Sequence, residues 1–310
     1  MGSTKTNVRE KVHMFKSGFI GIIGRPNVGK STLLNKIIGE KIAITSHKPQ
    51  TTRNRITGIK NVENGQLIFI DTPGIHRATT PLNEFMVTAA KDTFRSADII
   101  LLVVEAVEGV HRDDELIIES LRNIRLPVIL LINKIDLVRK KNILPVIDQF
   151  QHLFSFSQII PISALNGDGL SALMKQIWGL LPEGQRYFPD DMMTDRTERF
   201  IAAEIIRGKI IMLTHQEVPY ATAVVVESFK EDEDKNLLVI QATINVAKNS
   251  QKGIVIGKKG SMLKEIGKRA RQDMEKFFAT RIYLKLFVRV RKDWTHDAGM
   301  LREFGYAEKI

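Results

Sequence analysis

The stretch Gly24-Arg25-Pro26-Asn27-Val28-Gly29-Lys30-Ser31 decides which fold this chain is expected to adopt. It follows the apolar run at residues 19–23, which predicts a buried strand. It precedes a segment whose apolar residues share one helical face: Leu33, Leu34, Ile37 and Ile38. Strand, glycine loop and helix come in the order of a phosphate-binding loop, which disfavours the alternative of a chance glycine turn beside a surface lysine.

The residue types in this loop suit a polyphosphate. Gly24 and Gly29 allow backbone angles that a Cβ would oppose, so that successive N–H groups can turn towards an anion at the helix N-terminus. Lys30 can reach the β- and γ-phosphates, and the Ser31 hydroxyl can bind Mg²⁺. We therefore predict a nucleotide phosphate site that includes Gly24, Arg25, Pro26, Asn27, Val28, Gly29, Lys30, Ser31 and Thr32.

Beyond the loop, the hydrophobic pattern predicts an α/β fold. Residues 44–54 are polar and predict a long exposed loop, and a hairpin follows at 56–62 and 66–70 around Asn64-Gly65. Apolar runs then alternate with amphipathic segments; the runs lie at 99–104, 128–132 and 159–162, and the segments at 82–95, 111–124, 141–154 and 169–181. This alternation predicts a mostly parallel sheet with one antiparallel edge, and ligands collect at the carboxyl ends of such strands.

Two further motifs follow predicted strands at that edge. Asp71-Thr72-Pro73-Gly74 offers a carboxylate for Mg²⁺ and a glycine that lets the backbone approach a γ-phosphate, and we add Asp71, Thr72, Pro73, Gly74 and Ile75 to the phosphate site. The Asp136 carboxylate can accept from N1–H and the 2-amino group of guanine, which adenine lacks. We predict a guanine site formed by Asn133, Lys134, Ile135, Asp136, Ser163, Ala164 and Leu165, with a backbone N–H of the last three facing guanine O6.

The charge of the chain is concentrated near its carboxyl terminus. Residues 246–292 hold fourteen Lys or Arg against three Asp or Glu, so this segment alone accounts for the net charge of +11. A solvated helical face is one explanation for this concentration of positive charge. Binding of a polyanionic partner is the more specific explanation. Inside the segment, Gly257-Lys258-Lys259-Gly260 joins two predicted helices, the arrangement with which KH domains clamp single-stranded nucleic acid.

The order after residue 194 also resembles the type II KH fold. A helix at 195–213 and strands at 222–229 and 237–246 precede the helix-turn-helix, and a strand at 281–290 and a helix at 298–304 follow it. The second helix has a predicted apolar stripe of Leu263, Ile266, Ala270, Met274 and Phe277. We predict an RNA-binding surface made of Lys252, Gly257, Lys258, Lys259, Gly260, Lys264 and Arg271.

The nucleotide motifs resemble, over residues 17–182, those of the translation-factor-related bacterial GTPases. Pro26-Asn27-Val28 and Gln50-Thr51-Thr52-Arg53 are similar to the Era-type subgroup in particular. The resemblance implies GTP and GDP as ligands and a loop threonine that closes on Mg²⁺ and the γ-phosphate, for which we choose Thr52 over Thr51. Magnesium would thus be held by Ser31, Thr52 and Asp71, with Lys30, Thr52 and Gly74 catalytic, and the resemblance further implies a potassium ion at Asn27.

One departure concerns the attacking water. Ras-like enzymes carry a glutamine after the Asp-x-x-Gly turn, whereas this chain has Ile75, so we expect slow intrinsic hydrolysis that a partner accelerates. His76 and Arg77 are nearby candidates to position the water, although ordinary loop roles fit them better.

Two prolines, Glu183-Gly184 and Asp190-Asp191 interrupt the periodic pattern between Pro182 and Met193, which predicts a short, moderately flexible linker. We therefore expect a GTPase domain over 1–182, a linker over 183–193 and a KH type II domain over 194–310. The resemblance also implies binding of small-subunit ribosomal RNA near its 3′ end and a role in assembly of the small ribosomal subunit, with no DNA partner. The alternative is a GTPase switch whose basic domain binds an anionic membrane or a protein. An RNA-modifying enzyme lacks a second catalytic constellation in this sequence.

Composition sets the remaining expectations. The chain has no cysteine, which excludes disulfides and thiolate zinc sites, and its longest apolar run, 99–104, is far shorter than the ~20 residues of a membrane span. The first eighteen residues lack an apolar core, so we see no signal peptide. We expect a monomer in the cytoplasm, with peripheral contact at the inner face of the cell membrane as a secondary location.

Overall fold

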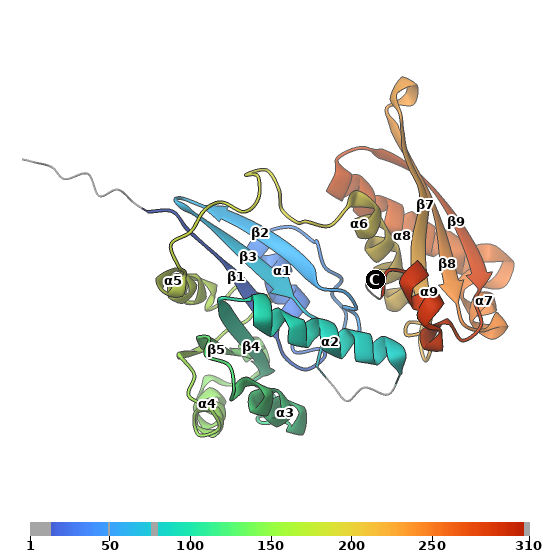
Figure 1. Ribbon diagram of the computed structural model, residues 1–310. Coiled ribbons are helices and arrows are strands. Elements are labelled where there is room, and N and C mark those ends of the chain that lie inside the picture. The colour runs from blue at the N-terminus through green and yellow to red at the C-terminus, as the bar shows by residue number, and fades with distance from the viewer. Residues whose placement is uncertain (1–13, 49, 76–79, 307–310) are drawn as a thin grey trace, which may run out of the picture.

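The computed structural model describes residues 14–48, 50–75 and 80–306, which form two α/β units (Figure 1). The first unit contains β1 (Lys16–Ile23), α1 (Lys30–Ile38), β2 (Ile56–Val62), β3 (Gly65–Asp71), α2 (Pro81–Ser96), β4 (Ile99–Glu105), α3 (Arg112–Leu121), β5 (Val128–Asn133), α4 (Ile143–Gln151), β6 (Gln158–Pro161) and α5 (Leu170–Leu180). The second contains α6 (Glu198–Leu213), β7 (Thr222–Asp232), β8 (Leu237–Val246), α7 (Asn249–Ile256), α8 (Ser261–Phe278), β9 (Arg281–Val290) and α9 (Ala298–Glu303).

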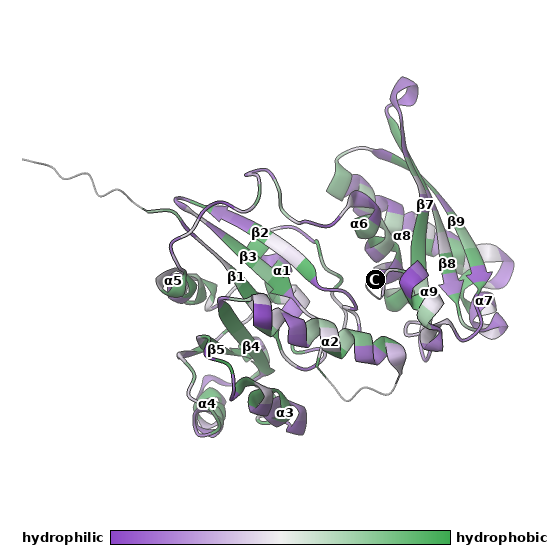
Figure 2. Ribbon diagram, in the orientation of Figure 1, coloured by the Kyte–Doolittle hydropathy of each residue, from purple (hydrophilic) through white to green (hydrophobic). Residues whose placement is uncertain are grey.

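The sheet of the first unit runs β2-β3-β1-β4-β5-β6. All its neighbouring pairs are parallel except β2 with β3, which form the antiparallel edge hairpin. One core packs α1 and α5 against one face, and a second core packs α3 and α4 against the other. Because β4 and β5 are buried on both faces, they are continuous apolar runs, as the colouring of β4 in Figure 2 shows. The predicted mostly parallel α/β sheet is confirmed.

The second unit is a three-stranded sheet in the order β7-β8-β9, with β7 antiparallel and β9 parallel to β8. Helices α6 and α8 cover one face, and Ile266, Ala270 and Met274 of the predicted stripe are fully buried in its core. Phe277 departs from the prediction, because it packs against the core of the first unit instead. The last turn of α8 therefore lies at the contact between the two units.

The loop between α1 and β2 is exposed as predicted at Thr45 and His47 but not at residues 51–53. Thr51, Thr52 and Arg53 are buried, at 8%, 7% and 1% of their accessible surface. Polar residues predominate in this segment, and the second unit covers it: Lys48 Nζ donates to two carbonyls at the end of α6, those of Ile211 and Thr214. The prediction was wrong for this part of the loop because the partners lie more than 160 positions further along the chain.

The predicted flexible linker is bound along the edge of the sheet. The Ile59 amide of β2 donates to the Met193 carbonyl at 2.8 Å, and the Asn61 side chain donates to the Asp190 carbonyl at 2.7 Å. The Gln66 side chain accepts from the amides of Tyr187 and Phe188. The linker thus pairs with backbone and side-chain groups of an edge hairpin, and these hydrogen bonds restrict the moderately flexible tether that the composition predicted.

A small fourth core joins the carboxyl-terminal segment to the first unit. Leu82 and Met86 of α2 pack with Trp294, Leu301 and Tyr306. Trp294 is fully buried, and its indole N–H donates to the Ala221 carbonyl at 2.9 Å. Within the described part of the chain, no helix combines the length and the apolar character that crossing a bilayer requires.

Candidate functional site

The glycine loop lies between β1 and α1, with its two glycines in conformations that a side chain would oppose. Gly24 has φ 149° and Gly29 has φ 102°. A Cβ on Gly24 would lie 2.4 Å from the Val103 carbonyl oxygen, and one on Gly29 would lie 2.3 Å from Asn133 Nδ2. The loop is therefore pressed against the ends of β4 and β5, and its amides curl at the N-terminus of α1.

Lys30 begins α1 and turns back over the loop. Its ammonium donates to the carbonyls of Gly24, at 3.0 Å, and Arg25, at 2.9 Å. Burial lowers the pKa of Lys30 to about 8, although the Asp71 carboxylate acts in the opposite direction. The buried ammonium group of Lys30 thus lies against the glycine loop, where the backbone amides and this positive charge together suit an anionic ligand.

Three oxygen-bearing side chains from separate segments converge beside the loop. Ser31 Oγ donates to Asp71 Oδ2 at 2.6 Å and lies 2.8 Å from Thr52 Oγ1, which itself lies 3.5 Å from Asp71 Oδ2. Burial raises the pKa of Asp71 to about 6, against the opposing effects of Lys30 and the two hydroxyls. Among the described residues no donor lies in hydrogen-bonding geometry to the buried Asp71 Oδ1.

This cluster fits Mg²⁺. Two hydroxyls and a carboxylate are hard oxygen ligands of the kind that Mg²⁺ prefers, and the unpaired oxygen of Asp71 is the type of buried acceptor that a cation satisfies. Thr51 is not part of the cluster, because its hydroxyl donates to the Lys48 carbonyl at 2.7 Å. Over the described ranges, no group of three His, Asp or Glu side chains forms another candidate metal centre.

The remaining phosphate-site residues have varied surroundings. Thr72 is buried and donates to the Ile22 carbonyl at 2.8 Å, and the Ile75 amide donates to the Gly24 carbonyl at 3.2 Å. Gly74 lies so close to the loop that a Cβ there would be 2.6 Å from the Pro26 nitrogen. Val28 is fully buried, Thr32 is half-buried in the first turn of α1, and Pro73 is buried between Thr72 and Gly74.

Two predicted side chains do not face the loop. The Arg25 guanidinium contacts Glu108 at 2.8 Å and Asp114 at 3.4 Å, so only its backbone borders the site. The Asn27 amide donates to the His47 carbonyl at 2.8 Å, which joins the loop to the segment before β2. His76 and Arg77 lie outside the described residues.

The guanine motifs meet at the ends of β5 and β6. Asn133 is buried; its Nδ2 donates to the Val28 carbonyl at 2.7 Å, and its Oδ1 accepts from the Ala164 amide at 2.9 Å. Asp136 is exposed and accepts from the Ser163 hydroxyl at 2.6 Å, which fixes one carboxylate oxygen.

The other residues of the predicted guanine site lie at the same edge of the sheet. Lys134 has φ 64° and donates to Glu105, and Ile135 and Leu165 lie at the rim, Leu165 being exposed. The two predicted segments therefore form one surface beside the glycine loop.

The Gly257–Gly260 turn joins α7 and α8 in the second unit and presents its lysines to solvent. Lys258 and Lys259 are both exposed, and Lys259 has φ 51°. Gly257 has φ 73°, and a Cβ there would lie 2.7 Å from the Met262 Cβ. Lys264 and Arg271 are exposed on α8, and Lys252 is half-buried on α7.

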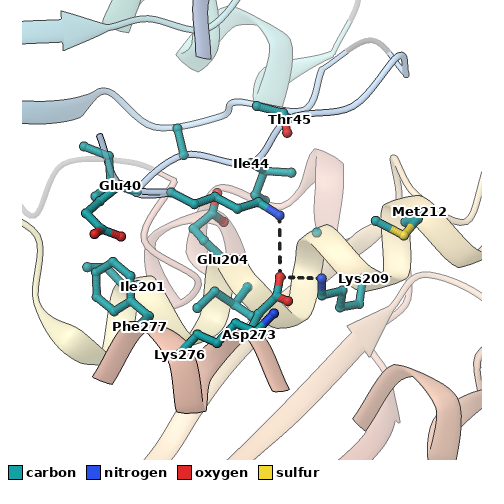
Figure 3. Close-up of a pocket in the computed structure, with 15 residues that line it drawn as sticks. Glu40, Ile44, Thr45, Ile201, Glu204, Lys209, Met212, Asp273, Lys276 and Phe277 are labelled. Atoms are coloured by element: carbon teal, nitrogen blue, oxygen red, sulfur yellow. Dashed lines mark hydrogen bonds and ion pairs between the residues drawn. The ribbon is translucent and has the colours of Figure 1, made fainter. Parts of the chain in front are cut away.

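The two units also meet at a cavity of about 310 Å³ between the start of the loop before β2 and helices α6 and α8. Lys209 of α6 forms an ion pair with Asp273 of α8 (Figure 3), and Lys41 of the first unit forms a second ion pair with the same carboxylate. The apolar part of its lining includes Ile44, Ile201 and Phe277. This ion-pair network bridges the units at a place distinct from the Thr52 segment.

Sequence reasoning missed the residues that join the two units. Arg53 was quoted within a motif without a role, and Arg207 and Trp294 were not considered. All three are almost completely buried. An arginine with no nearby acidic residue in a polar loop was the available signal, but its partners can only be found in three dimensions.

The fold and the site define a P-loop guanine-nucleotide-binding protein with a carboxyl-terminal KH domain. A family model described as 50S ribosome-binding GTPase matches residues 19–134, and a KH domain model matches residues 217–295. GTPase Era of Syntrophus aciditrophicus (strain SB) is 67% identical over 295 residues, covering 95% of this chain and 96% of that protein. GTPase Era of Geotalea uraniireducens (strain Rf4) is 56% identical over 292 residues, covering 94% and 98%. The chain therefore belongs to the Era family of GTPases.

Solved Era structures share the whole architecture. A variant of Aquifex aeolicus Era bound to GDP and AlF4⁻ is 46% identical, with a TM-score of 0.92 and coverage of 95% of this chain and all of that one. A structure of Era in complex with MgGDPNP and nucleotides 1506–1542 of 16S ribosomal RNA has the same identity, TM-score and coverage. The predicted KH type II organisation and the predicted membership of the Era subgroup are confirmed.

Proposed function

We propose that this chain is a GTP-hydrolysing switch that binds small-subunit ribosomal RNA near its 3′ end and assists assembly of the small ribosomal subunit. The observation that carries the proposal is that Thr52, beside Ser31 and Asp71, belongs to a loop that the KH unit covers. A nucleotide site and an RNA-binding unit that share a loop can influence each other. We divide the chain into a GTPase domain at 1–182, a linker at 183–193 and a KH domain at 194–310.

For the reaction, we assign the phosphates of GTP to the amides of the glycine loop and to Lys30. Ser31, Thr52 and Asp71 would hold Mg²⁺, which when bound neutralises charge that develops on the transferred phosphoryl group. The Gly74 amide would donate to a γ-phosphate oxygen, because that glycine packs directly against the loop at Pro26. These groups pre-organise the substrate and stabilise charge without forming a covalent bond to it.

Guanine recognition would depend on the free acceptor capacity of Asp136. Ser163 holds one carboxylate oxygen, and the other can accept from N1–H and the 2-amino group of the base. Asn133 joins the glycine loop to residue Ala164, so the base and phosphate sites keep a fixed spacing. The stem of Lys134 would cover one face of the ring.

Ile75 cannot orient the attacking water, so we propose slow intrinsic hydrolysis that a partner accelerates. The side chain of Ile75 is half-buried against the core under α3 and α4. A potassium ion near Asn27 would add positive charge beside the phosphates, and the resemblance to Era-type enzymes supports this addition.

Ribosomal RNA is the proposed partner of the second unit. The exposed Lys258 and Lys259 between two glycines suit the clamping of a single-stranded phosphate backbone. The related Era structure contains 16S ribosomal RNA, whereas the family model described with the 50S subunit covers only residues 19–134 and thus not the KH domain. The complex that includes both domains favours the small subunit. We further propose a cytoplasmic monomer, with exposed cations of α8 allowing peripheral contact with an anionic membrane.

The test is binding of an RNA fragment equivalent to the 3′ end of 16S ribosomal RNA, with GTP analogue or GDP bound. Lys258→Asp combined with Lys259→Asp is expected to reduce the affinity at least tenfold by charge reversal at the backbone contact. Lys140→Asp with Lys141→Asp, an equal charge change at exposed residues of the first unit, is the matched control. Equal losses in both double variants would contradict the KH assignment, and undiminished RNA binding would favour a membrane or protein partner.

A further inference from the structure

Arg53 belongs to the first unit, but its side chain lies inside the second. It is 1% exposed. Its Nη1 donates to the Thr222 carbonyl at 2.8 Å and to the Tyr306 hydroxyl at 3.3 Å. Its Nη2 donates to the carbonyls of Tyr220, at 2.8 Å, and Pro219, at 3.1 Å. The guanidinium is therefore bound mainly by backbone acceptors of a single short segment before and at the start of β7.

Two aromatic rings complete the environment of the Arg53 guanidinium. Arg53 Cζ lies 5.7 Å from the centre of the Trp294 ring and 5.4 Å from that of Tyr306. Among the described residues no carboxylate lies within ion-pair distance of Arg53, so carbonyl dipoles and π faces compensate its charge. We call Pro219, Tyr220, Thr222, Trp294 and Tyr306 the Arg53 cage.

The second unit also holds the peptide on the other side of Thr52. Arg207 of α6 donates to the Thr51 carbonyl and is itself held by Glu204, with contacts of 2.6 and 2.7 Å. The backbone before Thr52 and the side chain after it are thus both fixed by the second unit. The Thr52 hydroxyl itself contacts the first unit, 2.8 Å from Ser31 Oγ.

We propose that Arg53 is a positioning residue for GTP hydrolysis, whose binding in the Arg53 cage holds Thr52 at the magnesium site. The inference rests on the proposed function, since it concerns the same site. Docking of the KH domain and closure of Thr52 are then linked equilibria, and docking favours closure by the same coupling free energy with which closure favours docking. An RNA that shifts the KH domain changes the nucleotide site through this residue.

The cage also contacts α2, the helix that follows the Gly74 turn in the chain. Leu82 and Met86, on the helix that follows Gly74 in the chain, pack with Trp294 and Tyr306. One face of the cage therefore meets Arg53 and another meets α2. Movement of the carboxyl-terminal segment would release both the Thr52 loop and the start of α2 together.

The test compares Arg53→Ala and Arg53→Lys with wild type in the full-length protein. GDP and a non-hydrolysable GTP analogue are titrated separately, and hydrolysis is measured against Mg²⁺ concentration. Because only the GTP state requires Thr52, Arg53→Ala is expected to weaken the GTP analogue about tenfold and GDP less than about twofold, and to raise the Mg²⁺ requirement. Arg53→Lys keeps the charge but loses the forked contacts, so an intermediate effect is expected.

Lys41→Ala is the matched control, since it removes an ion pair between the units without touching the residues beside Thr52. It should shift the ratio of GTP-analogue to GDP affinity less than about twofold, because a largely exposed ion pair contributes little to docking. A second readout is the fluorescence of Trp294 in a Trp178→Phe background, which should respond to the GTP analogue in the presence of Arg53 and not in Arg53→Ala. Should Arg53→Ala not fold, Tyr306→Phe removes one acceptor and should shift the same ratio by a smaller factor.

A folded Arg53→Ala protein with the wild-type affinity ratio and Mg²⁺ dependence would overturn the inference. If the proposed function itself were incorrect, the wild-type protein would show no preference for guanine nucleotides or no Mg²⁺-dependent hydrolysis. That result is distinguishable from an unchanged Arg53→Ala variant.

Discussion

Ser31 Oγ and Thr52 Oγ1 lie 2.8 Å apart although 21 positions separate the two residues in the chain. The first residue is fixed by α1, and the second is in a loop without regular secondary structure. The distance between them therefore reports whether that loop is closed over the phosphate site. The same contact suggests the first of four mutational tests.

Replacing Thr52 by alanine removes one oxygen of the Ser31–Thr52–Asp71 cluster. We expect Mg²⁺-dependent GTP hydrolysis to fall about 10- to 100-fold, since one charge-stabilising ligand is lost. Thr52→Ser should retain most of the rate. Thr51→Ala, which loses only a bond to the Lys48 carbonyl, should change the rate less than about threefold. Steady-state rates at saturating Mg²⁺ distinguish the outcomes, and equal effects of the two alanine variants would refute the assignment.

Asp136→Asn tests base recognition. The amide would present a donor where guanine also presents donors, so we expect GTP to bind about 10³-fold more weakly while ATP binding stays weak. Ser163→Ala removes the hydroxyl that orients the carboxylate and should cost about tenfold. Calorimetric titration with both nucleotides measures the ratio. An Asp136→Asn protein that still prefers GTP would show that another group selects the base.

The titration of Asp71 predicts a pH dependence of stability without nucleotide. Burial raises its pKa from 3.8 to about 6, so the folded state binds the proton more tightly than the unfolded state. Stability from this group is present below pH 4 and is lost as the pH rises towards 6, by about 3 kcal/mol at most. Mg²⁺ with nucleotide requires the carboxylate, so the stabilisation that it brings should be larger at pH 7.5 than at pH 5.5.

Thermal midpoints at the two pH values measure this effect. Asp71→Asn should reduce the loss of stability between pH 4 and 6, to which Asp114 also contributes because burial raises its pKa to about 6 as well. The same variant should remove most of the added stabilisation by Mg²⁺ and GTP. Asp191→Asn, at an exposed position of the linker, is the control and should behave as wild type. An unchanged pH profile in Asp71→Asn would mean that another group titrates.

The two glycines of the Gly257–Gly260 turn should respond differently to alanine. Gly257 combines φ 73° and ψ 173° with a Cβ position 2.7 Å from Met262 Cβ, so Gly257→Ala should destabilise the KH domain by about 2–3 kcal/mol. Gly260 has φ 78° and open space around its Cβ position, so Gly260→Ala should cost only about 1 kcal/mol. Denaturant unfolding compares them, and equal losses would contradict the steric argument.

Sequence patterns predicted what depends on local periodicity and on motif chemistry. The strand before Gly24, the strands that precede Asp71 and Asn133, and the helices of the KH domain have hydrophobic patterns that match their burial. Parallel strands then bring the ends of these segments to one edge, so the nucleotide site could be assembled from the sequence. The choice of Thr52 over Thr51 came from family resemblance and not from periodicity.

What the sequence could not predict depends on contacts between the units. The polar composition around Arg53 favoured exposure, yet its acceptor at Thr222 lies 169 positions away. Phe277 continues the apolar stripe of α8 but packs against the first core, because helical periodicity gives a face and not the identity of the neighbour. Arg25 follows a loop glycine, but three carboxylates draw its side chain away from the phosphate site.

The attachment of the linker to the β2–β3 edge limits how the KH domain can travel. Thr57 Oγ1 donates to Asp195 Oδ2 at 3.0 Å, only two positions before Thr197, which caps α6. If these bonds persist when the domains separate, only Arg196 and Thr197 connect the bonded segment to α6. The KH domain then rotates about a hinge at the start of α6. A swinging domain stays at a high effective concentration near its docking face, so separation would be brief and quickly reversible unless RNA captures the open arrangement.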